Sequence, residues 1–216
     1  MKAIHSTPIL LDLPLNDSWL DGPLPVSPTV PSGWTGLERV MPALVAQFCP
    51  WRGSALEFGC EYGYSTSVLA QLFSHVTAVD WFVGDEHSGV REDYYAIARS
   101  NLAHRANVTL VQEDYRRWIA HDDRQTYDLI HVDMLHDDET TYRAGLWAAS
   151  HAPVILFHDT LAWPEVAPAV LRIAEKTGRE FWNYPHCHGL GVLPEKAHEA
   201  YCKAAENLHG KFARFA

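Results

Sequence analysis

Apolar runs of strand length alternate with helical segments from Ser54 almost to the end of the chain, and this alternation constrains the fold more than any other feature. The runs are SALEFGC, HVTAVDW, NVTLVQED, YDLIHVD, APVILFHD and REFWNY. Helices between them are expected near residues 65–73, 91–104, 115–120, 138–150 and 164–177. Strands that are apolar on both faces and separated by helices are typical of a parallel sheet covered on both sides.

The last run, GLGVLP, follows REFWNY after only the four residues PHCH. This gap is too short for a crossover helix, so the final strand is predicted to be antiparallel. The sequence therefore predicts a doubly wound, mostly parallel, seven-stranded α/β sheet of the Rossmann-like class. A polar, Ala-rich helix at about residues 195–212 is expected to close the chain.

The length of 216 residues suits one domain with a substantial core and is short for two. Residues 1–35 are rich in proline, which blocks helix interiors and central strands, so an irregular N-terminal arm is predicted there. Residues 36–216 are predicted to form a single domain with its core at 54–194, and its first helix is expected from Gly36 to about Phe48.

The balance of charge argues against one class of partner. With 17 basic and 27 acidic residues the net charge is −10, whereas nucleic-acid binding needs phosphate neutralisation. The sequence shows neither a run of membrane-span length nor a signal-peptide core near its start, so a cytoplasmic location is predicted. The four cysteines are scattered without a CxxC pair, which indicates neither a disulfide framework nor a zinc ribbon.

Candidate functional residues stand where each apolar run ends, because ligands of an open parallel sheet bind beyond the carboxyl ends of its strands. In chain order they are Gly59 to Gly63, Asp80, Glu113 with Asp114, Asp133, and His158 with Asp159. Nearly every run ends in an acid or a glycine. One acidic pocket beside a glycine turn is therefore predicted at this edge of the sheet.

The glycine turn, in LEFGCEYGYST, has Gly59 and Gly63 four residues apart. Glycines let the backbone approach a ligand closely. The spacing lacks the third glycine of a dinucleotide fingerprint, which disfavours an NAD-dependent oxidoreductase. Asp80 ends the second run, where an acid can accept hydrogen bonds from both ribose hydroxyls. The plainer alternative is a structural turn and a solvent-facing acid.

Five stretches resemble the successive motifs of class I S-adenosylmethionine-dependent methyltransferases: LEFGCEYGYST, VTAVDW, VTLVQED, YDLIHVDMLHDDETTY and VILFHDT. The metal-dependent branch with catechol-type and macrolide-sugar O-methyltransferases is more similar, since its first motif is also E-x-G-x-x-x-G-x-S. GDEHSG, HVDMLHDDETTY and CHGLGVL resemble bacterial methyltransferases of glycan assembly. The resemblance covers about residues 54–194, and the turn ASHAPV departs from it by lacking the usual glycine.

The resemblance implies an S-adenosylmethionine-dependent O-methyltransferase whose acceptor is a hydroxyl of a sugar or glycan. The alternatives are a catechol-like phenol as acceptor, or a non-catalytic S-adenosylmethionine-binding partner subunit. Glu57 and the Gly59–Gly63 backbone would hold the methionine end, Asp80 the ribose, and Asp114 with Tyr115 the adenine. The full set of implied cofactor-binding residues is Glu57, Gly59, Cys60, Glu61, Gly63, Ser65, Asp80, Trp81, Asp114, Tyr115 and Asp133.

Asp133, His158 and Asp159 match the positions where the metal-dependent branch holds a divalent cation. The residues themselves support a cation, because two buried carboxylates at adjacent strand ends repel each other unless one is present. Oxygen ligands suit Mg²⁺, and an imidazole moves the preference toward Mn²⁺, Fe²⁺ or Zn²⁺, so Mg²⁺ or Mn²⁺ is expected. The alternative is that His158 only caps the next helix or orients Asp159.

His136, three residues past Asp133, is the predicted general base, because an imidazole of near-neutral pKa can take a hydroxyl proton. In this hypothesis a metal on Asp133 lowers the pKa of the acceptor hydroxyl and His136 removes the proton. The alternative is a surface histidine in the acidic loop HDDE.

Other polar or aromatic stretches supply candidate acceptor contacts. The loop WFVGDEHSGVREDYY, residues 81–95, is predicted to be a substrate lid with His87 as a contact, or else a solvated loop. The HCH stretch places His188 near the pocket rim. Trp81, Trp163 and Trp182 are candidates to line the acceptor pocket. A homodimer that exchanges the N-terminal arm is compatible with the sequence.

Overall fold

The computed structural model describes residues 29–30, 32, 34, 36–49, 51–84, 92–121, 125–185 and 187–195, and the backbone of 213–215. The strands are β1 (Ser54–Phe58), β2 (His75–Asp80), β3 (Val108–Gln112), β4 (Leu129–Val132), β5 (Val154–Phe157), β6 (Phe181–Tyr184), β7 (Leu190–Pro194) and β8 (Ala213–Phe215). The helices are α1 (Leu37–Phe48), α2 (Tyr64–Leu72), α3 (Tyr95–Leu102), α4 (Tyr115–His121), α5 (Asp138–Ala149) and α6 (Val166–Thr177).

The strands form one mixed sheet in the order β3-β2-β1-β4-β5-β7-β6-β8. Strands β1 to β5 pair in parallel, and β7 is antiparallel to both β5 and β6. The predicted seven-stranded, mostly parallel fold with an antiparallel last strand is therefore confirmed. The short β8 adds an eighth, antiparallel strand at the β6 edge, which was not predicted. The helix predicted for 195–212 falls on residues outside the described part, as does most of the proline-rich arm.

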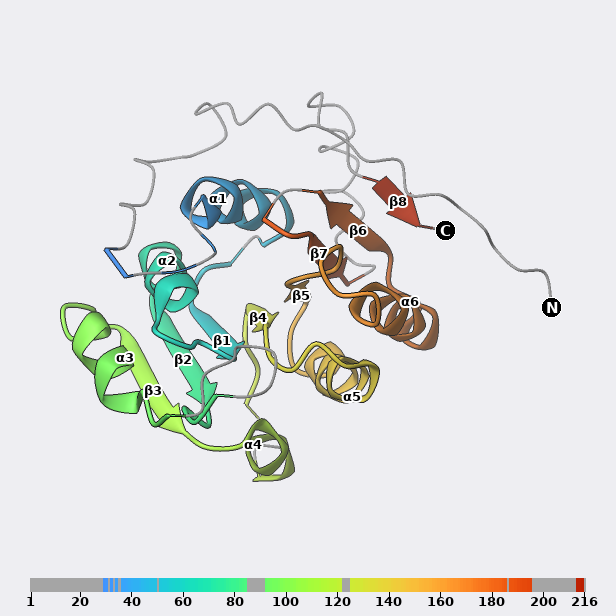
Figure 1. Ribbon diagram of the computed structural model, residues 1–216. Helices are drawn as coiled ribbons and strands as arrows, with labels where there is room; N and C mark the ends of the chain where they lie inside the picture. The colour runs from blue at the N-terminus through green and yellow to red at the C-terminus, as the bar shows by residue number, and fades with distance from the viewer. Residues whose placement is uncertain are drawn as a thin grey trace.

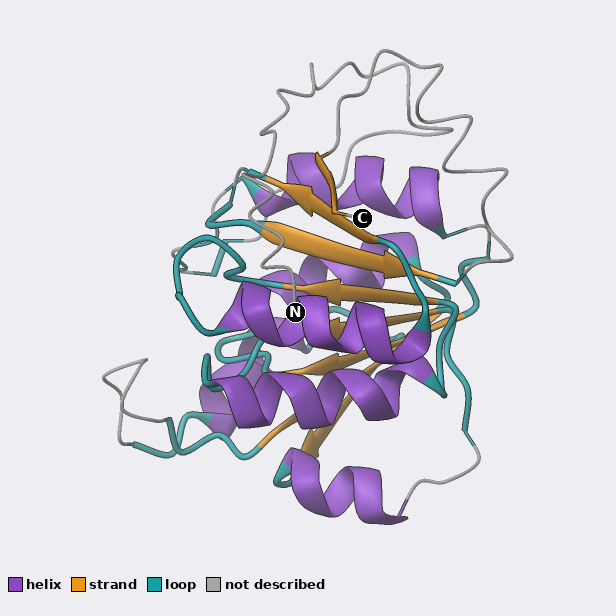
Figure 2. Cartoon of the chain, turned by 90° about the vertical axis from the view of Figure 1, so that its right-hand side faces the viewer, coloured by secondary structure: helices purple, strands orange, loops and turns teal. Residues whose placement is uncertain are grey.

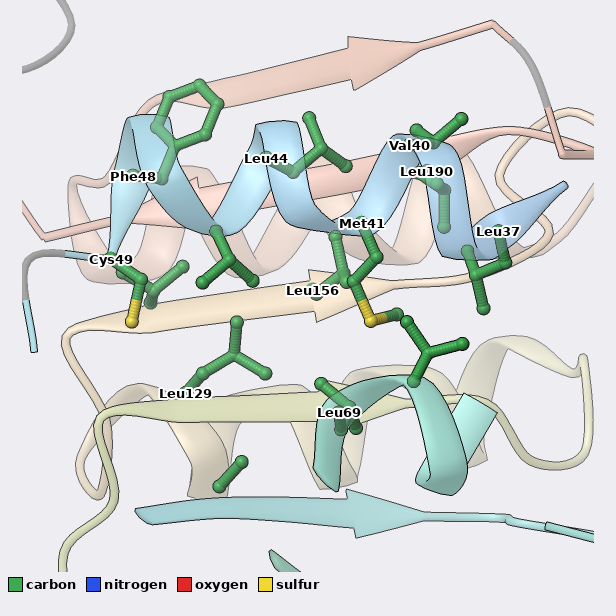
Figure 3. Close-up of a cluster of buried hydrophobic side chains, with 14 of the residues drawn as sticks. Leu37, Val40, Met41, Leu44, Phe48, Cys49, Leu69, Leu129, Leu156 and Leu190 are labelled. Carbon is green, nitrogen blue, oxygen red and sulfur yellow. The ribbon is translucent and has the colours of Figure 1, made fainter. Parts of the chain in front are cut away.

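Helices cover both faces of the sheet. In Figure 1, α1, α2 and α3 lie on one face and α4, α5 and α6 on the other, and Figure 2 shows the strands running between the helices. Helix α1 buries an apolar face that includes Met41 and Leu44 against Leu129 of β4 and Leu156 of β5 (Figure 3). No helix in the described ranges has the length and hydropathy needed to span a membrane.

The strand order reverses between β1 and β4, which lie side by side in the middle of the sheet. Their carboxyl ends are held together, because the backbone N–H of Asp133 donates to the carbonyl oxygen of Phe58 at 2.9 Å. Helices on opposite faces diverge at such a switch point and leave a crevice there. The fold thus fixes where a ligand can bind before any side chain is considered.

Candidate active site

A cavity of about 280 Å³ lies beyond the carboxyl ends of β1, β2 and β4. Its wall includes all but two of the predicted cofactor-binding residues, the exceptions being Glu57 and Gly63. Sequence reasoning missed several other residues of the wall, namely Ser32, Trp34, Tyr64, Val79, Tyr94, Met134, Leu135 and Thr140. Arg116, which no prediction singled out, also belongs to the wall.

The two glycines of the turn have different structural reasons. A Cβ on Gly59, at φ +81°, would lie 1.7 Å from the carbonyl oxygen of Asp133, so the turn passes directly against the end of β4. A Cβ on Gly63, at φ +91°, would lie 2.7 Å from Cδ1 of Leu102. Gly59 therefore shapes the cavity, while Gly63 lets α2 begin against α3.

Asp80 binds the glycine turn itself. One carboxylate oxygen accepts hydrogen bonds from the backbone N–H groups of Cys60 at 2.9 Å and Glu61 at 3.0 Å, and the other accepts from Phe82 N–H at 2.7 Å. Burial raises the pKa of Asp80, and these three amide donors oppose that rise. Asp80 lines the cavity, and its contact with ribose remains a prediction. In this structure its carboxylate also holds the glycine turn in place.

Replacing Asp80 with alanine should weaken S-adenosylhomocysteine binding by roughly 1–3 kcal/mol, because charge-assisted hydrogen bonds at the turn are lost. Calorimetric titration measures the change. Glu175→Ala, which removes an exposed acid on α6, is the control and should bind normally. Wild-type affinity in Asp80→Ala would exclude Asp80 from the cofactor site.

The predicted adenine pair lies at the far end of the cavity from Asp159. Arg116 donates from Nε to Oδ1 of Asp114 at 2.9 Å, and this pairing holds the pKa of Asp114 below its ordinary value. Tyr115 contacts Phe58, with ring centroids 6.1 Å apart, and so packs at the base of this end.

Glu57 lies beneath the turn and off the cavity wall. It is fully buried, accepts a hydrogen bond from the hydroxyl of Thr66, and lies 2.9 Å from Nδ1 of His131. The contact with the methionine end of the cofactor, which the resemblance implied, stays a prediction, and in this structure the Glu57 carboxylate contacts a histidine on β4. His131 drew no notice in the sequence because it sits inside an apolar run.

Two carboxylates and an imidazole meet on the opposite side of the cavity. Nε2 of His136 lies 2.7 Å from Oδ2 of Asp159 and 3.5 Å from Oδ1 of Asp133. Asp159 has φ +58°, an uncommon backbone conformation for a residue with a side chain, and such strain clusters at functional sites. These three residues form a group that can hold a metal ion.

His158 lies behind this group rather than in it. Its side chain is buried and off the cavity wall, and its Nδ1 lies 2.9 Å from Oδ2 of Asp133. The sequence made His158 the metal ligand and His136 the base. In this structure His136 lies between the two cavity-facing carboxylates, because the turn after β5 directs Asp159, and not its neighbour, into the cavity. The two predicted roles stay predictions.

The carboxylates decide the charge of His136. Burial disfavours its charged form, but Asp133 and Asp159 outweigh burial and raise the pKa of His136 to about 9. Burial also opposes the charge of Asp133, yet His158 and His136 outweigh it and lower the pKa of that carboxyl. An imidazolium cannot accept a proton, so His136 becomes available as a base or ligand only when another cation balances the two carboxylates.

The remaining candidates fall in different places. His87 lies outside the described residues. His188 is off the cavity wall, at φ +63°, and its ring centroid is 5.1 Å from that of Trp34. Trp81 and Trp163 line the cavity as predicted, and the Trp163 ring stacks on His136 at 5.2 Å. Trp182 does not line it, because it packs against Phe48 in the core.

Comparison with known proteins agrees with this geometry. A family model described as a methyltransferase domain matches residues 56–160, which run from the glycine turn through the Asp159 strand end. The chain contains a methyltransferase domain. The match places every cavity-lining acid of the methyltransferase inside the shared domain, and S-adenosylmethionine is the methyl donor of this class.

Two solved structures illustrate the fold that the methyltransferase shares. TomG, an O-methyltransferase from Streptomyces achromogenes in complex with S-adenosylmethionine, is 20% identical with a TM-score of 0.51, over 70% of this chain and 76% of that one. CalS10, an amino pentose methyltransferase from Micromonospora echinaspora with bound S-adenosylmethionine, is 14% identical with a TM-score of 0.55, over 77% and 92%. No match to the chain was found among curated proteins.

Proposed function

We propose that this methyltransferase is a divalent-metal-dependent O-methyltransferase that acts on a hydroxyl of a sugar or glycan. One observation carries the proposal: Asp133, His136 and Asp159 share a single cavity with the glycine turn. A methyl donor on the turn and an acceptor oxygen at this group would then lie within one enclosed space. Such convergence has no purpose in a partner subunit that only binds the cofactor.

The donor set fits a divalent cation. Asp133 and Asp159 would hold it with His136 as third ligand, a mixed oxygen and nitrogen set that suits Mn²⁺ as well as Mg²⁺. Asp133 and Asp159 raise the pKa of His136 and so favour its protonated form, and a cation held by the two carboxylates would displace that proton. When bound, the ion would orient the acceptor and lower the pKa of its hydroxyl.

The other cavity residues would position the two substrates. Acidic side chains at Glu61, Asp80 and Asp114 give the donor end a negative potential that favours a positively charged sulfonium. Trp34 and Trp163 provide flat apolar walls at the acceptor end. A sugar ring fits between such walls, and so does a catechol-like phenol, which is the alternative acceptor. Transfer itself then depends mainly on alignment of the two reacting atoms.

The experiment that tests this function measures methyl transfer from S-adenosylmethionine to panels of sugars and catechols by mass spectrometry. We expect turnover to stop with excess chelator and to return with Mg²⁺ or Mn²⁺. Full turnover in chelator, with no metal found by elemental analysis, would contradict metal dependence and would leave Asp133 and Asp159 acting directly on the acceptor.

His136→Ala separates a ligand from a base. If His136 is a ligand, the variant should bind metal more weakly and excess metal should partly restore its rate. If it is a base, the rate should fall by about 10²–10⁴-fold and added metal should not restore it. His121→Ala, at the surface end of α4, is the control and should behave as wild type.

A cytoplasmic location, the lid role of residues 81–95 and an arm-exchanged homodimer are further proposals that follow from the sequence.

A further inference from the structure

A second cluster of possible ligands lies behind the cavity wall and shares Asp133 with the first. It consists of His131, Asp133 and His158, whose nearest donor atoms all lie within 4.8 Å of one another. His131 is on β4 beside Leu156 of β5, and His158 comes two residues after Leu156. His158 is the first residue after β5, where its backbone N–H still donates to Val132 of β4, and the two imidazole ring centroids lie 5.9 Å apart.

Both imidazoles are buried, and each has one ring nitrogen without a hydrogen-bond partner among the described residues. His131 is 0% exposed and His158 is 1% exposed, and Nε2 of each has no hydrogen-bond partner among the described residues. An unsatisfied buried polar atom costs about 1–3 kcal/mol, and such atoms in native proteins often mark an unseen ion or water. A cation would remove that cost at Nε2 of His131, whereas at His158 an ion shared with Asp133 would bind on the Nδ1 side, because the two nitrogens of one ring point away from each other.

The surroundings of His131 are those of a metal ligand. Its Nδ1 lies 2.9 Å from Oε1 of Glu57, which in turn accepts from Thr66. Histidines that bind metals commonly donate their second N–H to a carboxylate, which fixes the ring and leaves the other nitrogen bare. Glu57 and Asp133 also supply two negative charges, which balance one divalent cation if both histidines are neutral.

Asp133 faces both clusters. Its Oδ1 lies 3.5 Å from His136 on the cavity side, and its Oδ2 lies 2.9 Å from His158 on the buried side. A carboxylate with one oxygen on each side can bridge two ions. The Trp34 ring lines the cavity and packs against His158, with the two ring centroids 3.6 Å apart.

We propose that His131, Asp133 and His158 form a second, buried metal site, and that Asp133 bridges it to the ion of the proposed O-methyltransferase site. Two imidazoles and one carboxylate suit Zn²⁺, Fe²⁺ or Mn²⁺ better than Mg²⁺. Because this ion is buried, its task is to fix Asp133 and to tie β4 to β5 beneath the cavity, and it does not touch the acceptor.

The competing explanation for these contacts is a proton on His131 in place of a metal ion. Burial opposes the charged form of His131, but Glu57 outweighs it and raises the pKa of this histidine in the metal-free state. A buried Glu57–His131 ion pair without metal would then account for the same contacts. The two explanations differ in the number of ions that the protein binds, so that number decides between them.

The test is the metal content of the full chain by elemental analysis, after purification and after titration of metal-stripped protein with Zn²⁺ or Mn²⁺. Wild type should bind two equivalents, His131→Asn one, and His188→Asn, which alters a nearby histidine outside both clusters, two. Glu57→Gln should weaken the second equivalent by about 10–100-fold. Co²⁺ should give nitrogen-ligand absorption bands in wild type that His131→Asn lacks.

Equal metal content in wild type and His131→Asn, or a single wild-type equivalent that supports methyl transfer, would overturn the second site. A single wild-type equivalent that is lost in His131→Asn would keep the buried site and exclude the pocket ion. The wild-type count needs no variant, so a His131→Asn protein that fails to fold leaves the proposal testable. The proposed function fails separately: two equivalents without methyl transfer would keep the buried site, whereas metal-dependent transfer with one equivalent would keep the function and exclude the buried site.

Discussion

Asp133→Asn is expected to lower kcat/KM by about 10³-fold, because neutralising this carboxylate removes about 4 kcal/mol of metal-derived stabilisation of the transition state. The change is local, since asparagine keeps the shape and the backbone hydrogen bond to Phe58 that holds β4 against β1. It leaves His136 and His158 facing a neutral amide in place of their shared carboxylate. Steady-state kinetics and elemental analysis measure the loss of rate and of metal together.

Asp138→Asn is the matched control for this variant. Asp138 is an exposed carboxylate five residues further along, where it pairs with Arg172 on the surface. Its loss should leave both rate and metal content unchanged, because an exposed ion pair is worth little and lies away from the cavity. Wild-type turnover in Asp133→Asn would contradict the pocket ion and the bridging role of Asp133 alike.

The strand ends were predictable because parallel strands bring their carboxyl ends to one edge. Asp80, Asp114, Asp133 and Asp159 each follow an apolar run, and all four line the cavity. The antiparallel β7 was predictable for a similar reason, since four residues cannot form a crossover. These features depend only on chain direction and length, which a sequence contains.

The directions of individual side chains were not predictable. His136 and His158 each adjoin a carboxylate in the sequence, and which of the two imidazoles faces the cavity depends on the turn at Asp159, which has a positive φ. Glu57 and His131 are 74 positions apart in the sequence, and each lies within an apolar run, so their contact could not be read from the sequence. Trp34 stands in a proline-rich stretch without periodicity, so nothing in the sequence indicated that it would reach His158.

Gly59→Ala is expected to lower both stability and activity strongly, because Gly59 closely approaches the end of β4. A methyl group there would lie 1.7 Å from the carbonyl oxygen of Asp133, so Gly59→Ala must move either the turn or the end of β4. The left-handed backbone costs roughly 1–2 kcal/mol for alanine and the clash about 1–3 more. Thermal unfolding should therefore shift down by about 4–20 °C, at about 2–4 °C per kcal/mol for a chain of this size.

The activity of Gly59→Ala should fall further than its stability suggests. In the proposed function the turn carries the methyl donor and Asp133 lies on the acceptor side, so separating them by about 1 Å should lower kcat/KM by about 10²-fold. Gly36→Ala is the control, because Gly36 has φ +110° but a Cβ there would meet nothing within 4 Å. That variant shares the backbone strain without the clash, so it should lose some stability yet bind S-adenosylhomocysteine and turn over normally. If Gly59→Ala instead kept wild-type kcat/KM, the contact between the turn and β4 would not set the distance between donor and acceptor.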